Sequence, residues 1–141
     1  MKLIHMSDIH LTTPGSTIGG RDPRYNFERA LGHILLDHGD AELMVITGDL
    51  SDWGDRADYE WLRSRLDSFP LPVRLCIGNH DNRAAFLSVF PEYAEPDGFA
   101  QGIQDTVAGP LPVSRHDRTP DPCRPLLHAT TRLAGAATVG T

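Results

Sequence analysis

The sequence predicts an α/β fold in which three parallel strands alternate with helices in a βαβαβ order. Three short apolar runs are separated by segments with helical periodicity, as expected of crossover units. Each run leads into a short polar string: Asp8-Ile9-His10, Gly48-Asp49 and Gly78-Asn79-His80-Asp81. Because open parallel sheets bind ligands beyond the carboxyl ends of their strands, we expect the three strings to meet at one edge.

The first strand is expected over residues 2–6, directly before Asp8. The next segment, 11–23, is rich in Gly, Thr and Pro and is typical of a loop. Residues 25–38 then predict an amphipathic helix that ends at Gly39. Its apolar stripe recurs at steps of three and four residues and comprises Phe27, Leu31, Ile34, Leu35 and His38.

The run 43–47 is continuously apolar and β-branched, which predicts a strand buried on both faces. A second amphipathic helix is expected next, closed by Pro70 and Pro72. Its stripe is Tyr59, Leu62, Leu66 and Phe69. A third strand over 73–77 follows, and Asn82 is a candidate cap for a short third helix.

The chain is expected to divide near residue 107. Residues 1–107 carry the alternating pattern, whereas residues 108–141 hold five of the eleven prolines and show no apolar period. We expect 108–141 to be a Pro-rich tail that is disordered or non-native.

Composition narrows the class of protein. The 141 residues carry a net charge of −6, which argues against binding to a nucleic-acid backbone. No apolar run approaches the ~20 residues of a membrane span. Cys76 lies in an apolar run and Cys123 lies in the Pro-rich tail, so we do not expect a disulfide between them. We therefore expect a cytoplasmic location.

The first two strings offer hard and borderline metal ligands. Asp8 and His10 are two apart on an extended segment, so their side chains can grip one cation from the same side. Asp49 follows a glycine at the end of a buried strand, where a carboxylate can bridge two cations about 4 Å apart. Taken alone, each string is equally compatible with a solvated turn or a helix cap.

The third string is the most specific. Asn79 offers an amide oxygen to a second cation, and His80 can donate a proton to a phosphoryl or leaving-group oxygen. Asp81 could hold the His80 ring in its working tautomer. The alternative is a polar turn in which Asn82 caps the next helix.

The order Asp-x-His, Gly-Asp and Gly-Asn-His-Asp resembles the calcineurin-like metallophosphoesterase superfamily, most closely its cyclic-nucleotide and glycerophosphodiester phosphodiesterases. The resemblance covers residues 1–105 and implies the first half of a two-sheet α/β sandwich. It also implies a phosphoric ester hydrolase in which two divalent ions (Fe, Mn, Zn or Co) activate a hydroxide to attack a small phosphodiester. By this resemblance Asp8, His10, Asp49 and Asn79 bind metal, while His80, with Asp81 beside it, acts on the phosphate.

The sequence departs from that family after the third string. The family uses a later metal-binding histidine and a Gly-His-x-His string, and neither is present, since His116 and His128 lie in other contexts. One alternative is therefore a truncated, inactive fragment or a noncatalytic module of the same fold. A DNA-repair nuclease is a further alternative, which the acidic charge disfavours. A half-sheet would also expose an edge and an apolar face, which predicts homo-oligomers.

The roles of four other side chains near the strings are not decided by the sequence. Trp53 and Tyr59 could line a substrate mouth, although packing on a helix is the more common role of aromatic residues at such spacing. Arg21 and Arg24 could meet a phosphodiester, and the sequence assigns neither.

Overall fold

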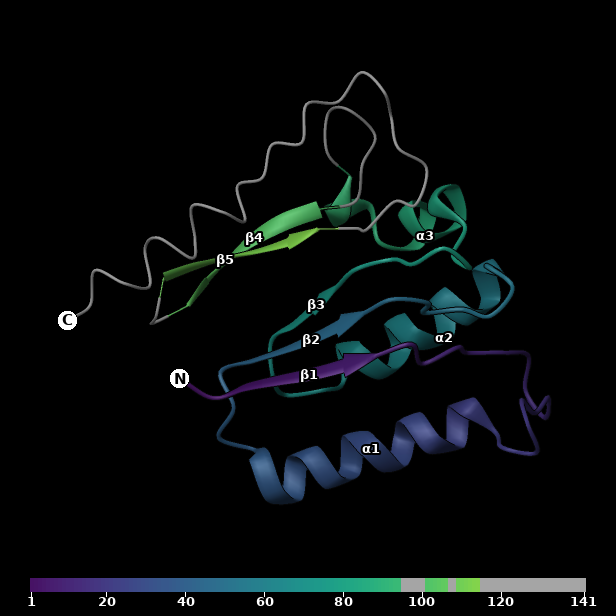
Figure 1. Ribbon diagram of the computed structural model, residues 1–141, viewed down its shortest axis with the longest axis horizontal. Helices are drawn as coiled ribbons and strands as arrows, with labels where there is room; N and C mark the ends of the chain where they lie inside the picture. The colour runs from purple at the N-terminus through teal and green to yellow at the C-terminus, as the bar shows by residue number, and fades with distance from the viewer. Residues whose placement is uncertain (95–100, 107–108, 115–141) are drawn as a thin grey trace.

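The computed structural model describes residues 1–94, 101–106 and 109–114 (Figure 1). Its centre is a parallel sheet of β1 (Leu3–Ser7), β2 (Leu43–Thr47) and β3 (Val73–Leu75), paired in the order β1-β2-β3. The predicted α/β architecture is thereby confirmed. All three strands point the same way, so the segments that follow them emerge at one edge.

The helices begin and end close to the expected positions. They are α1 (Pro23–His38), α2 (Arg56–Asp67), α3 (Arg83–Val89) and the short 3-10 helix η1 (Pro91–Tyr93). The Asp22 carboxylate accepts the Arg24 backbone N–H at 2.9 Å and starts α1, and Gly39 ends it, as predicted. The predicted Asn82 cap is also confirmed, because its Oδ1 accepts the Ala85 backbone N–H at 3.1 Å.

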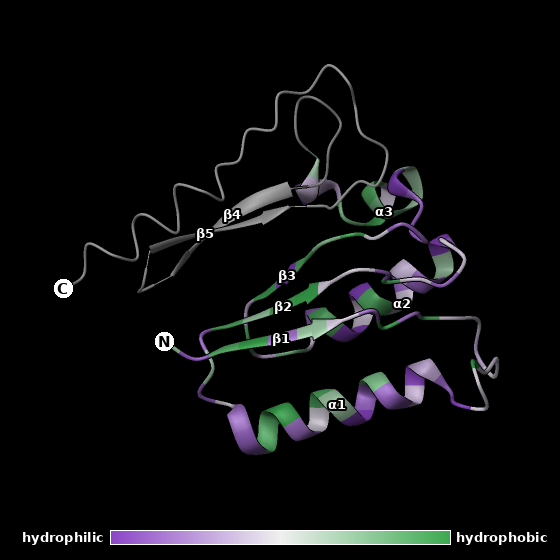
Figure 2. Cartoon of the chain, in the orientation of Figure 1, coloured by the Kyte–Doolittle hydropathy of each residue, from purple (hydrophilic) through white to green (hydrophobic). Residues whose placement is uncertain are grey.

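One face of the sheet carries the main core. Strand order follows chain order, so right-handed crossovers place α1 and α2 on the same face. Met44 and Ile46 of β2 pack there with Leu31 of α1 and Tyr59 of α2. Figure 2 shows β2 as hydrophobic along its length, whereas α1 alternates between polar and apolar residues.

A smaller cluster occupies the other face of the sheet. Leu43 and Val45, which alternate with the core residues of β2, pack with Cys76 and Leu3. Burial on both faces explains why the β2 sequence is continuously apolar rather than alternating.

An antiparallel hairpin follows the α/β unit, with β4 (Gln101–Thr106) paired to β5 (Gly109–Ser114). The sequence did not predict this hairpin, and β5 lies at the start of the expected tail. Residues 115–141 are outside the described residues, so a disordered or non-native tail from 108 and a domain boundary near 107 stay predictions.

Candidate metal centre

The segments that leave β1 and β2 run side by side beyond the sheet. The backbone N–H of Asp8 donates to Thr47 O at 2.9 Å, and that of His10 donates to Asp49 O at 3.0 Å. The pairing continues with Leu11 N–H to Leu50 O at 2.9 Å. These bonds fix the first polar string directly beside the second.

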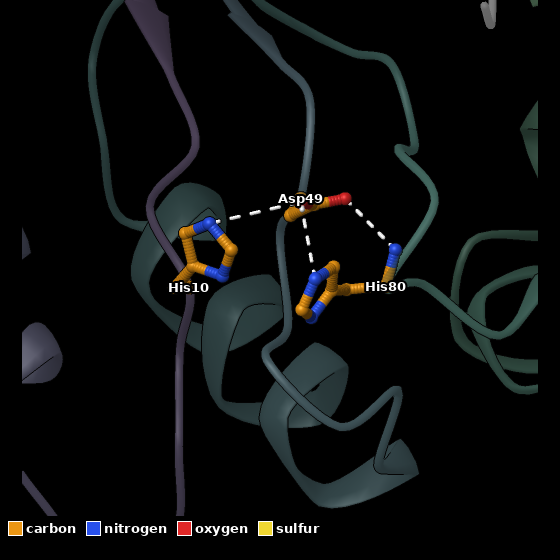
Figure 3. Close-up of side chains that lie close together, drawn as sticks. All are labelled: His10, Asp49 and His80. Carbon is orange, nitrogen blue, oxygen red and sulfur yellow. Dashed lines mark hydrogen bonds and ion pairs between the residues drawn. The ribbon is translucent and has the colours of Figure 1, made fainter. Parts of the chain in front are cut away.

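Three predicted side chains meet at this edge: His10, Asp49 and His80 (Figure 3). Each offers a ligand atom, and the three atoms lie within 4.8 Å of one another. Asp49 Oδ2 is 3.7 Å from His10 Nε2 and 4.0 Å from His80 Nε2. One nearly buried carboxylate oxygen therefore faces two imidazole nitrogens that remain partly open to solvent.

The other carboxylate oxygen of Asp49 holds the third string in place. Asp49 Oδ1 accepts the backbone N–H of His80 at 2.9 Å. Gly78, the first residue of the string, leaves room for this approach, because a Cβ there would overlap Asp49 Oδ1. Asp49 thus connects two strand ends with one side chain.

Asp52 contacts both histidines of the group, and the sequence did not single it out. Its Oδ1 lies 2.9 Å from His10 Nδ1, and its main-chain oxygen lies 2.9 Å from His80 Nδ1. A carbonyl oxygen only accepts, so Nδ1 of His80 must carry the proton in that contact, and the carboxylate favours the same tautomer in His10. Both Nε2 atoms are then left to face Asp49, which is the arrangement typical of metal-binding imidazoles.

Asp8 lies at the same edge but outside the group of three. The carboxylate of Asp8 is exposed and lies against Gly48, where any Cβ would overlap it. Asn79 is exposed and adjoins His80 in the chain. Asp8 and His10 both have positive φ, 54° and 44°, a strained backbone that persists mainly at functional sites.

The Asp81 carboxylate contacts backbone rather than the His80 ring. It accepts the N–H groups of Gly78 at 2.7 Å and of Leu50 and Ser51 at 2.9 Å, as well as the Tyr59 hydroxyl at 2.8 Å. Burial raises the pKa of Asp81, and these hydrogen bonds oppose the rise. Asp81 therefore links the ends of β2 and β3, while Asp52 occupies Nδ1 of His80, the place expected for Asp81.

The donor set fits a divalent transition metal. Imidazole nitrogen with carboxylate oxygen suits zinc, iron, manganese and cobalt, and the two glycines beside Asp8 and Asp49 keep the space around the donors free of side chains. The geometry thus supports a candidate His-Asp-His metal site.

Comparison with known proteins agrees with this chemistry. The model of the calcineurin-like phosphoesterase family matches residues 1–119. The chain belongs to that family. Calcineurin-like phosphoesterases use divalent metals, and the group of His10, Asp49 and His80 could hold one.

The similar curated proteins are phosphodiesterases. A probable cyclic nucleotide phosphodiesterase of Rhodopseudomonas palustris is 36% identical over 105 residues, which are 74% of this chain and 38% of that protein. The 3',5'-cyclic adenosine monophosphate phosphodiesterase of Pseudomonas aeruginosa is 29% identical over 82 residues, 57% of this chain and 30% of that protein. A probable glycerophosphodiester phosphodiesterase of Arcobacter nitrofigilis is 25% identical over 97 residues, which are 66% of this chain and 34% of that protein. This calcineurin-like chain spans about a third of the length of these relatives.

The structure distinguishes the side chains to which the sequence assigned no role. Tyr59 is fully buried and packs against Phe86, which is the packing role, whereas Trp53 is 78% exposed beside Asp52. Arg24 forms an ion pair with Asp58 at 2.9 Å.

Among the described residues, no helix combines the length and apolar character needed to cross a bilayer.

Proposed function

We propose that this calcineurin-like chain supplies metal ligands and a proton donor for the hydrolysis of a small phosphodiester. The observation that carries the proposal is the convergence of His10 Nε2 and His80 Nε2 on one carboxylate oxygen of Asp49. Those groups come from three different strand ends, and packing alone gives no reason to bring them together. Two divalent ions are proposed as the cofactors.

Bound cations would polarise the phosphate and lower the pKa of a water toward neutrality. In the proposed site Asp8, His10 and Asp49 hold the first cation, and Asp49 and Asn79 share the second. The exposed positions of Asp8 and Asn79 leave their oxygens free for this role.

His80 is proposed to protonate the leaving alkoxide. The Asp52 main-chain oxygen holds Nδ1, so the ring presents Nε2 to the site. The pKa of His80 is raised by that hydrogen bond and by the charges of Asp49, Asp52 and Asp81, which favours the protonated ring of a general acid. We propose that Asp81 acts indirectly, by positioning the backbone on either side of the site.

Metal counting on the purified chain tests the proposal. We expect two equivalents of Mn²⁺ or Zn²⁺ and hydrolysis of bis(4-nitrophenyl) phosphate that stops on addition of a chelator. Asp49→Ala and His10→Ala should lose metal, whereas His80→Ala should keep metal and lose activity. Hydrolysis that survives chelation unchanged would refute the proposal, and loss of metal in His80→Ala would make His80 a ligand.

A noncatalytic module of the same fold is the second candidate. The absence of a Gly-His-x-His string from the sequence favours it, because the remaining ligands must otherwise come from elsewhere. A chain that binds no metal and hydrolyses no diester would establish this alternative.

The names of the relatives point to the substrate class. They act on cyclic nucleotides or glycerophosphodiesters, and we propose a small diester of that kind for this chain. The net charge of −6 disfavours the DNA-repair nuclease. Homo-oligomers and a cytoplasmic location stay predictions.

A further inference from the structure

A cavity of about 480 Å³ adjoins the metal centre. Asp8, His10 and Asp52 form part of its lining, so it opens directly onto the site. Most of the remaining lining is apolar and comes from β1, the loop before α1, and α1 itself, including Met6, Ile9, Ile18 and Phe27. A volume of this size with apolar walls and few polar groups is typical of a small-molecule site.

A tight turn in the loop before α1 builds one wall of the cavity. Ile18 N–H donates to Arg21 O at 2.8 Å, and Arg21 N–H donates back to Ile18 O at 3.0 Å. The two residues between them are Gly19 and Gly20, with φ of 57° and 77°, as a type I′ turn requires. Because directly paired residues project to the same face, the turn presents the Ile18 and Arg21 side chains together, and both line the cavity.

Neither of these side chains stabilises the described part of the chain through core packing or an ion pair. Ile18 is 41% exposed, which leaves a large apolar side chain in water. Arg21 is exposed and makes no ion pair with the residues that the structure describes, in contrast to Arg24, which is paired with Asp58. A rigid turn that holds an unpaired guanidinium and an unpacked isoleucine over a cavity is suited to contacting a ligand.

We propose that this cavity is the subsite for one organic substituent of the phosphodiester, and that Arg21 and Ile18 select a flat heteroaromatic group. This inference rests on the proposed function. A planar guanidinium stacks on an aromatic base, and the apolar wall covers the other surfaces of the ring. Asn26, which also lines the cavity, offers an amide donor and acceptor to the edge of such a ring.

The phosphate and its substituent would then occupy adjoining places. His10 belongs to both the metal centre and the cavity lining, and Asp8 and Asp52 beside the centre also line the cavity, so a diester held at the centre can extend one substituent into the cavity without a rearrangement of the chain. A glycerol-like substituent lacks an aromatic face, so Arg21 would add little to its binding affinity. The cavity therefore favours a nucleoside over a glycerol substituent.

Ligand-observed saturation-transfer NMR on the full, metal-free chain tests the subsite with adenosine and glycerol as probes. We expect saturation of the adenine protons and none of glycerol. Arg21→Ala should weaken adenosine binding about tenfold, the size of one lost base-stacking contact. Arg21→Lys should lose most of the same binding, because an ammonium keeps the charge without the plane, and Ala30→Leu should fill the cavity from α1. Arg29→Ala is the matched control, since Arg29 lies on α1 and does not line the cavity.

Two results would overturn the subsite. One is saturation of adenosine no greater than that of glycerol in the wild-type chain. The other is unchanged adenosine binding in both Arg21→Ala and Ala30→Leu. Failure of the proposed function would appear in other measurements, as no bound metal and no hydrolysis of the diester. Adenosine binding in the NMR experiment requires neither metal nor hydrolysis, so the two failures can be told apart.

Discussion

Oδ1 of Asp52 lies 2.9 Å from Nδ1 of His10, while the main-chain oxygen of the same residue contacts His80. One residue therefore orients both imidazoles, but through two different groups. The side chain hydrogen-bonds His10 and lies 3.7 Å from His80 Nδ1, whereas the hydrogen bond to His80 comes from the backbone.

Asp52→Asn separates the two contacts. The substitution removes the carboxylate that fixes the His10 tautomer and leaves the bond to His80 in place. Loss of such a supporting contact typically weakens metal affinity about 10- to 100-fold. Calorimetric titration with Zn²⁺ measures the change, and the exposed Asp55→Asn nearby serves as the control. Wild-type affinity in Asp52→Asn would show that the side chain does not support the site.

Asp81 is expected to matter for stability more than for chemistry. Asp81→Ala leaves three backbone donors and the Tyr59 hydroxyl without their acceptor, so the free energy of unfolding should fall by about 3 kcal/mol. Tyr59→Phe removes one of these four bonds and also the hydroxyl oxygen that accepts the Asn82 backbone N–H at 3.0 Å, so it should cost about 2 kcal/mol. Urea denaturation monitored by circular dichroism gives both values. A fall of under half a kilocalorie for Asp81→Ala would contradict this role.

The sheet and the convergence of the strings were predictable because both follow from local patterns. The continuous apolar run 43–47 gave β2 with its observed bounds, Leu43–Thr47. β3 ends at Leu75, two residues before the apolar run does, because apolar character continues beyond the ladder into Cys76 and Ile77. Apolar patterning therefore locates a strand better than it locates the strand's end.

The details of the site were less predictable because they depend on contacts across the chain. The Asp52 contact with His10 spans 42 positions, and no local motif signals it. Asp81 was expected to orient the His80 ring from its place in Gly-Asn-His-Asp, but adjacency in sequence does not fix where a carboxylate points. The three backbone N–H groups that it accepts come from two strand ends, which only the folded chain reveals.

The stability of the metal-free chain should depend on the protonation of His80. Its pKa is raised, first by the hydrogen bond to the Asp52 main-chain oxygen and then by the charge of Asp49. Because the folded state holds the proton more tightly than the unfolded chain, this contribution is complete below the ordinary histidine pKa and is lost as pH rises through the folded value. NMR titration of the His80 ring should show a pKa above the ordinary range, and His80→Gln should remove this part of the pH dependence. A titration at or below the ordinary value would contradict the assignment.

The ion pair between Arg24 and Asp58 should be the most costly polar contact to break. Asp58 is 1% exposed and also accepts the Ser51 hydroxyl at 2.8 Å, while Arg24 reaches it at 2.9 Å from the start of α1. Asp58→Ala leaves a partly buried guanidinium without its partner, so we expect a loss of about 3–5 kcal/mol in the free energy of unfolding. Arg65→Ala is the matched control, because its pair with Glu28 is exposed on both sides and should be worth less than about 1 kcal/mol. Equal losses for the two variants in urea denaturation would show that burial does not set the strength of the Arg24 pair.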